Sequence, residues 1–384
     1  GVKTAAASLR GGPLVFAGVL GGVSGVTVHI LCARVLGPLS YGAFGSLVSA
    51  TAAGEVWRFS TQVRTTSEVA SGVSSSHAVS SVIKRMALAT PLLVLSCFLV
   101  ATYASVGGYV AAGAGVFFVL SSVWSAGRRG AALGAGMVKN AASGLVICAV
   151  ARVFLSVVGA LLWGVAGAMA GGALAEVLGG LAVRLPGNDP RPLLESQVKS
   201  NWAVMSGLSL SPPGADVLVM TSSMNAADAS SYAAASAFSR GALIVGQLLL
   251  LSYLPVLYKE GRDAFVKKGR HAIVVAGALA AVGCLGAPVV LSLFVDTSIV
   301  SLLSFAIGFI AVVCGAYVNM TSYSMLSKTK KSFMTVAVAW SGIVLATVLA
   351  FIFKPSDVTT GSLLLGVTSL GSVLFAYIFS KRVS

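Results

Sequence analysis

Two arginines of this sequence lie where charged groups are rare, inside long apolar stretches. They are Arg152 and Arg240, and Gln247 follows Arg240 by seven residues, so that both side chains share one face of a helix. A guanidinium group in apolar surroundings needs a partner. A face that carries Arg and Gln therefore looks into a polar cavity or onto a partner helix. A purely structural ion pair between Arg240 and Asp216 is the alternative.

The composition identifies the apolar surroundings as a lipid bilayer. Apolar residues make up 57% of the 384 residues, charged residues only 10%, and the mean hydropathy is +0.93. A soluble domain carries roughly a quarter charged residues, so a soluble enzyme of this length is excluded. Twelve stretches are long enough to be membrane-spanning helices: 11–33, 41–60, 86–106, 109–126, 141–162, 164–183, 202–224, 230–257, 272–294, 299–324, 333–353 and 359–380.

The distribution of Lys and Arg predicts how these helices are oriented. The chain has 26 basic and 11 acidic residues, a net charge of +15. With twelve spans, 21 basic residues fall in segments on one side and two on the other. Because cytoplasmic loops carry the excess of Lys and Arg, we expect both termini to be cytoplasmic. The positive charge thus indicates orientation and contact with membrane lipids, not binding of nucleic acid.

The segment 184–200 divides the spans into two groups of six. It contains three prolines and several charged residues between apolar stretches. We therefore expect an all-α multi-pass protein with an N-terminal half (1–183), a cytoplasmic linker (184–200) and a C-terminal half (201–384). Two six-helix halves are a common transporter plan, with the binding site between them near mid-membrane.

Three acidic residues also lie within spans, where a charge costs about 2.5–3.5 kcal/mol. Glu55 shares a helix face with Arg58, so a local ion pair at the membrane interface is one interpretation. Glu176 could have a structural role near Arg184. Asp216 follows two prolines and a glycine that must break its helix. Broken helices within a membrane line a cavity or are buried in protein.

Several other residues have simple structural interpretations. The five cysteines lie in apolar stretches without metal-ligand spacing, so we expect neither a metal site nor disulfides. His29 is expected to be a hydrogen-bonded core residue rather than a proton carrier. The small residues that follow Gly164 favour close helix packing. No catalytic or nucleotide-binding signature is present, so neither an enzyme nor a bound cofactor is expected.

One motif resembles a known family. The stretch ARVLGPLSYGAF at 33–44 is similar to the ARxLGPxxYGxF signature that joins the first two spans of polysaccharide flippases. These belong to the multidrug/oligosaccharidyl-lipid/polysaccharide exporter (MOP) superfamily. The segments 216–218, 231–235 and 238–240 are similar to the seventh and eighth spans of that family.

The resemblance implies two six-helix bundles around a central cavity that opens alternately to each side. It also implies a bacterial inner-membrane protein of polysaccharide biosynthesis, with other glycan-synthesis membrane proteins as candidate partners. The implied cargo is a polyprenyl-pyrophosphate-linked oligosaccharide, carried from the cytoplasmic to the outer leaflet. Cationic groups in a shielded cavity suit a pyrophosphate. Candidates for binding it are Arg34, Arg152, Arg240, Lys139 and Gln247.

Energy coupling and two rival functions complete the expectations. Glu55, Glu176 and Asp216 are candidates for exchanging a coupling ion. Arg34 has a rival role in the turn that contains Gly37. A cation-coupled multidrug exporter of the same fold would instead need acidic and aromatic cavity residues. A non-transporting scaffold for a glycan-synthesis complex predicts that the buried arginines are paired internally.

Overall fold

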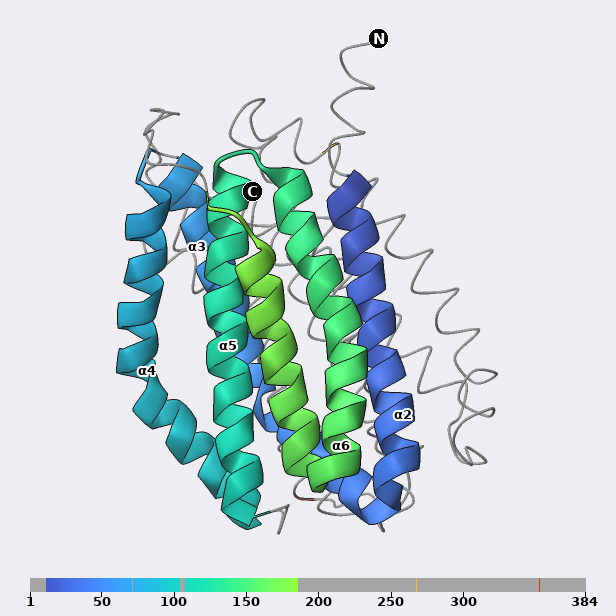
Figure 1. The fold of residues 1–384 in the computed structure, drawn as a ribbon. Helices are drawn as coiled ribbons and strands as arrows, with labels where there is room; N and C mark the ends of the chain where they lie inside the picture. The colour runs from blue at the N-terminus through green and yellow to red at the C-terminus, as the bar shows by residue number, and fades with distance from the viewer. Residues whose placement is uncertain (1–11, 71, 104–107, 186–266, 268–351, 353–384) are drawn as a thin grey trace.

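The computed structural model describes residues 12–70, 72–103 and 108–185, together with the single residues 267 and 352 (Figure 1). These residues form α-helices, and α2 and α6 each contain a sharp bend that joins two helices. The elements are α2 (Gly12–Ala50), α3 (Ala52–Ala70), α4 (Ser75–Tyr103), α5 (Gly108–Gly134) and α6 (Val138–Ala182). Five of the six expected spans of the N-terminal half lie mainly on one helix or helix arm each, whereas the expected span 41–60 is divided between α2 and α3 by the turn at Thr51. Apart from the single residue 352, spans seven to twelve lie outside the described residues.

The bend in α2 lies at Gly37, within the motif at 33–44. Its φ of 71° lies in the left-handed region that favours glycine, so the chain bends where Gly-Pro predicts a turn. The Nδ1 of His29, before the bend, lies 3.0 Å from the hydroxyl of Tyr41, after it. Tyr41 is fully buried. The contact agrees with the expectation that His29 is a hydrogen-bonded core residue.

The bend in α6 lies at Trp163 and Gly164, where φ of Gly164 is 58°. It folds the helix into a hairpin whose two arms run side by side (Figure 1). Small residues line the contact: Gly159 lies against the backbone of Gly167, and Gly171 against that of Leu155. A Cβ atom at either of these glycines would overlap backbone atoms. The prediction that the small residues after Gly164 permit close packing is therefore confirmed.

The cytoplasmic loops predicted at 61–85 and 127–140 are wrong in extent. Most of 61–85 is helical, because α3 continues to Ala70 and α4 begins at Ser75. The hydroxyl of Ser74 accepts a 3.3 Å hydrogen bond from the amide of His77 and so caps α4. Similarly, α5 continues to Gly134. Hydropathy ended these spans too early because their polar residues, such as Thr65, are buried between helices and not in a loop.

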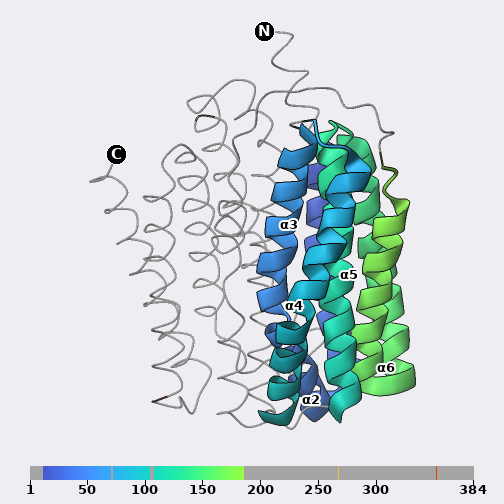
Figure 2. The ribbon, with the colours of Figure 1, turned by 90° about the vertical axis from the view of Figure 1, so that its left-hand side faces the viewer.

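The described helices form one packed bundle. Figure 2 shows α3, α4, α5 and α6 from the side, and α5 lies between α3 and α6, with α4 packed on its flank. The arms of α6 also pack against α2, through a cluster that includes Ile30, Phe44 and Met169. Large apolar side chains such as Phe154 are exposed on the outside of α6, as expected for a surface that faces lipid. Among the described helices, the segments Gly12–Gly37, Gly108–Gly134 and Val138–Ala182 are long and apolar enough to cross a membrane.

Candidate functional site

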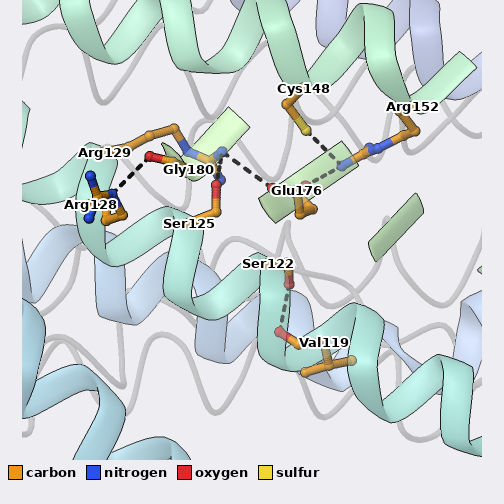
Figure 3. Close-up of polar contacts among 9 residues, drawn as sticks. All are labelled: Val119, Ser122, Ser125, Arg128, Arg129, Cys148, Arg152, Glu176 and Gly180. Carbon is orange, nitrogen blue, oxygen red and sulfur yellow. Dashed lines mark hydrogen bonds and ion pairs between the residues drawn. The ribbon is translucent and has the colours of Figure 1, made fainter. Parts of the chain in front are cut away.

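A carboxylate and two guanidinium groups meet inside the bundle. Arg129 of α5 donates from Nη1 to Glu176 Oε2 at 3.3 Å, and Arg152 donates from Nη2 to Glu176 Oε1 (Figure 3). We call Arg129, Arg152 and Glu176 the buried triad. The side chains of Arg129 and Glu176 are each 1% exposed, whereas that of Arg152 is 23% exposed.

The hairpin of α6 explains why Arg152 and Glu176 meet. Each lies twelve residues from Gly164, on opposite arms, and equidistant residues of a helical hairpin lie at the same depth. Gly179 packs against Cys148 one turn further along, so the arms stay close at this depth. The ion pair is therefore a consequence of the bend and of the small residues beside it.

Arg129 is positioned by α5. Its Nη1 also donates a 2.7 Å hydrogen bond to the hydroxyl of Ser125, one turn earlier on the same helix. Its Nε and Nη2 have no hydrogen-bond partner among the described residues, although both atoms are buried. Unmet donors on a buried charged group are unfavourable. The Nε and Nη2 groups of Arg129 can therefore donate hydrogen bonds to a further acceptor.

Weaker contacts surround Arg152. Its Nη2 lies 3.7 Å from the sulfur of Cys148, and its Cζ lies 5.8 Å from the ring centre of Phe118. Arg58 of α3 adds a further positive charge that acts on Glu176. Within the described residues, the site thus holds more guanidinium than carboxylate groups.

The structure describes some of the predicted site residues and not others. It brings Arg152 and Glu176 together, although the sequence suggested different roles for them. Glu176 pairs with Arg129 and Arg152 rather than with Arg184, and these internal pairs are compatible with the structural role suggested for it. Glu55 lies on α3, but its side chain is outside the described set.

The remaining candidates lie apart from the buried triad or beyond the described residues. Arg34 is exposed close to the bend of α2, and Lys139 is exposed at the start of α6. The structure brings neither into the buried triad. Asp216, Arg240 and Gln247 lie outside the described residues, so the predicted pair of Arg240 with Asp216 and the broken seventh span stay predictions.

Sequence analysis missed Arg129, because Arg128 and Arg129 were both assigned to a cytoplasmic loop. The two neighbours point to different partners (Figure 3). Arg128 donates to the carbonyl oxygens of Gly180 and Val183, at 2.8 Å each, and so caps the last turn of α6. The available signal was the four-residue spacing from Ser125 to Arg129, which places a hydroxyl and a guanidinium on one helix face.

A second triad of the same residue types joins α3 to α4 near the protein surface. Glu68 Oε1 accepts from Arg64 Nε at 2.7 Å and from Arg85 Nη2 at 3.2 Å. These three side chains, which we call the surface triad, are 24–32% exposed. Arg85 also donates to the hydroxyl of Ser81 at 3.1 Å. The surface triad is a natural control for the buried triad.

Comparison with known proteins identifies the fold. No protein-family model matches the chain, and no curated protein sequence matches it. Solved structures of transporters match nearly its whole length. A crystal structure of MATE in complex with MaD3S has a TM-score of 0.67 at 15% identity, over 98% of this chain and 95% of that one.

Two further matches belong explicitly to the MOP superfamily. A transporter from Pyrococcus furiosus has a TM-score of 0.67 at 14% identity, over 97% of this chain and 95% of the other. An outward-facing multidrug resistance MATE family transporter has a TM-score of 0.65 at 15% identity, over 97% and 94%. The chain therefore has the all-α, multi-pass membrane fold of MOP superfamily transporters. This fold agrees with the one that the sequence resemblance implies; membership of the superfamily and of its polysaccharide branch stays a proposal.

Proposed function

We propose that this protein is a flippase that moves a polyprenyl-pyrophosphate-linked oligosaccharide from the cytoplasmic to the outer leaflet by alternating access. The observation that carries the proposal is the buried triad, with its excess of guanidinium groups, inside a transporter fold. Guanidinium groups bind phosphate oxygens through paired, charge-assisted hydrogen bonds. They are strongest where water is excluded.

Arg152 is the residue of the described part best suited to contact the pyrophosphate. It is the partly exposed member of the buried triad, and Glu176 holds its position. The proposal retains Arg34, Arg240, Lys139 and Gln247 as further contacts. It also retains cytoplasmic termini and a bacterial cell membrane, since the distribution of basic residues favours that orientation. The isoprenoid tail would stay in lipid throughout.

The cation-coupled drug exporter is the less favoured function. A cationic drug would meet the repulsion of Arg129, Arg152 and Arg58 in this part of the protein. The MOP transporter from Pyrococcus furiosus is described as having a binding pocket of reverse polarity that suggests a different function. The superfamily fold therefore does not dictate an acidic pocket. For ion coupling we favour Asp216 or Glu55, because Glu176 already has two arginine partners.

A scaffold without transport activity is the second candidate. One observation favours it, because Arg152 is paired internally with Glu176 as that function predicts. The two functions differ in what Arg152 does. In a flippase it also binds cargo, so its loss weakens cargo binding; in a scaffold its replacement affects stability alone.

Native mass spectrometry of the gently purified protein tests the proposal. We compare the wild type with Arg152→Gln and Arg240→Ala, and use Arg64→Gln of the surface triad as a matched control. A co-purified polyprenyl-pyrophosphate sugar that is lost in the first two variants and kept in the control is the expected result. If all four proteins carry the same ordinary phospholipids and no such sugar, the flippase function is wrong.

A further inference from the structure

We propose that Arg129 and Glu176 are positioning residues that release Arg152 to an anionic cargo. On cargo binding, Arg152 exchanges Glu176 for a phosphate group, and Glu176 is taken over by the N–H groups of Arg129 that have no partner in the described structure. This inference rests on the proposed function, since it requires a cargo with a phosphate. It adds a mechanism and two residues that do not touch the cargo.

The first argument is the unused capacity of Arg129. A guanidinium has five N–H donors, and a carboxylate can accept two of them side by side. In this structure only Nη1 of Arg129 contacts Glu176, at 3.3 Å, while the buried Nε and Nη2 have no partner among the described residues. A small rotation of the guanidinium would replace this single contact with a paired one. Arg129 can therefore hold Glu176 more strongly than it does here.

The second argument is that Glu176 needs a replacement partner when Arg152 leaves it. Its side chain is 1% exposed, and a buried carboxylate that loses a guanidinium partner becomes strongly unfavourable. If Arg152 moved to a phosphate without compensation, this cost would oppose cargo binding. A second guanidinium, on a different helix and already within reach, removes much of that cost. Arg129 on α5 has this position (Figure 3).

The third argument is that Arg152 is the member that can move. Its side chain is 23% exposed, whereas those of its two partners are 1% exposed. Two of its contacts are weak ones, with the sulfur of Cys148 at 3.7 Å and the ring of Phe118 at 5.8 Å. A thioether or thiol sulfur is a weak acceptor. A phosphate would replace these contacts with stronger ones, and Phe118 would limit how far the guanidinium turns.

The exchange predicts that loss of either arginine of the buried triad weakens pyrophosphate binding, whereas loss of the Glu176 charge tightens it. Geranylgeranyl pyrophosphate is the probe, geranylgeraniol is its uncharged counterpart, and binding is measured on the monodisperse protein in nanodiscs. Arg152→Gln should weaken binding of the pyrophosphate about tenfold or more, since it removes the contact itself. Glu176→Gln should tighten binding about fivefold, because Arg152 no longer has a competing partner.

Arg129→Gln should weaken binding about fivefold, although Arg129 does not touch the probe, because Glu176 then keeps Arg152. The double variant R129Q/E176Q should bind at least as well as the wild type. It also removes both buried partners together, so it stays measurable even if a single variant does not fold. Arg64→Gln of the surface triad should bind like the wild type and controls for overall charge.

The outcomes separate this inference from the proposed function. If the pyrophosphate binds better than the alcohol but Glu176→Gln weakens binding as Arg152→Gln does, or the double variant stays below the wild type, Arg129 and Glu176 only support the fold. The release mechanism is then wrong while the proposed cargo stands. If the wild type binds both probes equally, the anionic cargo is wrong and the release mechanism with it.

Discussion

The buried and surface triads have the same residue types, but two members of the buried triad are shielded from water and none of the surface triad is. In each, one glutamate accepts hydrogen bonds from two arginines, and the contacts join neighbouring helices or helix arms. Glu68 and its partners are about a quarter to a third exposed, whereas Glu176 and Arg129 are 1% exposed. Exposed pairs contribute about 0–1 kcal/mol, because water and salt screen them. Loss of one partner from a buried group costs about 3–5 kcal/mol.

The difference indicates what each triad is suited to do. A buried ion group is often no more stabilising than apolar residues of the same volume, so the presence of the buried triad is not by itself evidence of added stability. The charges of Arg129 and Glu176 are screened little by water, because their side chains are 1% exposed. The surface triad lacks this property and serves to connect α3 with α4. The following experiments test the contrast, from the largest expected effect to the smallest.

Glu176→Gln should have the largest effect on stability. It leaves Arg129 and Arg152 facing each other in a buried site, and we expect the free energy of unfolding to fall by about 3–5 kcal/mol. Thermal and denaturant unfolding in nanodiscs measures the change. A loss below about 1 kcal/mol would mean that the buried triad behaves like a surface one, and the contrast would fail.

Removal of the charges of both Arg129 and Glu176 should lower the free energy of unfolding less than removal of the Glu176 charge alone. In a double-mutant cycle of Arg129→Gln and Glu176→Gln, we expect a coupling energy of about 1–3 kcal/mol, because the residues contact each other. Unfolding of the four proteins under one condition gives the value. Additive effects would show that the 3.3 Å contact contributes little to stability.

Arg128→Gln should have an intermediate effect, although it breaks no ion pair. Arg128 donates two 2.8 Å hydrogen bonds to the last carbonyl groups of α6, and loss of such charged bonds costs about 1.5–3 kcal/mol when the acceptors stay buried. Hydrogen exchange at residues 178–184 should rise locally. Exchange that rises equally over the whole bundle would contradict a local capping role.

Glu68→Gln should have the smallest effect. We expect less than about 1 kcal/mol, and we expect the difference from wild type to shrink at high salt because these charges are screened. Unfolding at low and high salt measures both quantities. The same salt series on Glu176→Gln should show little change, and equal salt dependence at the two sites would remove the distinction between them.

Local features of the fold could be predicted from the sequence. The apolar windows locate the helices, Gly37 marks the bend of α2, and the small residues after Gly164 predict the tight hairpin of α6. These features depend on neighbours within a few turns. The ends of α3 and α5 could not be predicted, because their polar residues are buried by other helices, which a hydropathy window does not represent.

The candidate site could be predicted only in part. Arg152 and Glu176 were selected because charges are rare inside apolar spans. Their pairing, and the part played by Arg129, depend on contacts between residues 24 and 47 positions apart. Arg128 and Arg129 are identical in type and adjacent, and only the rotation of α5 decides which one is buried. The rotation of α5 about its own axis cannot be predicted from a single sequence.

The glycine contacts of α6 have a mechanical consequence. Because the backbones at Gly159 and Gly167 already touch, one arm cannot slide across the other without separating from it. These contacts favour movement of the two arms together, as one rigid unit. A displacement at Arg152, near the middle of one arm, would then also move both ends of the hairpin. These ends are the turn at Trp163 and the backbone of Arg184, which exchanges two hydrogen bonds with the side chain of Asn140. Arg184 is the first residue of the linker to the second half of the chain, so a small displacement at Arg152 would be passed on to the start of that linker.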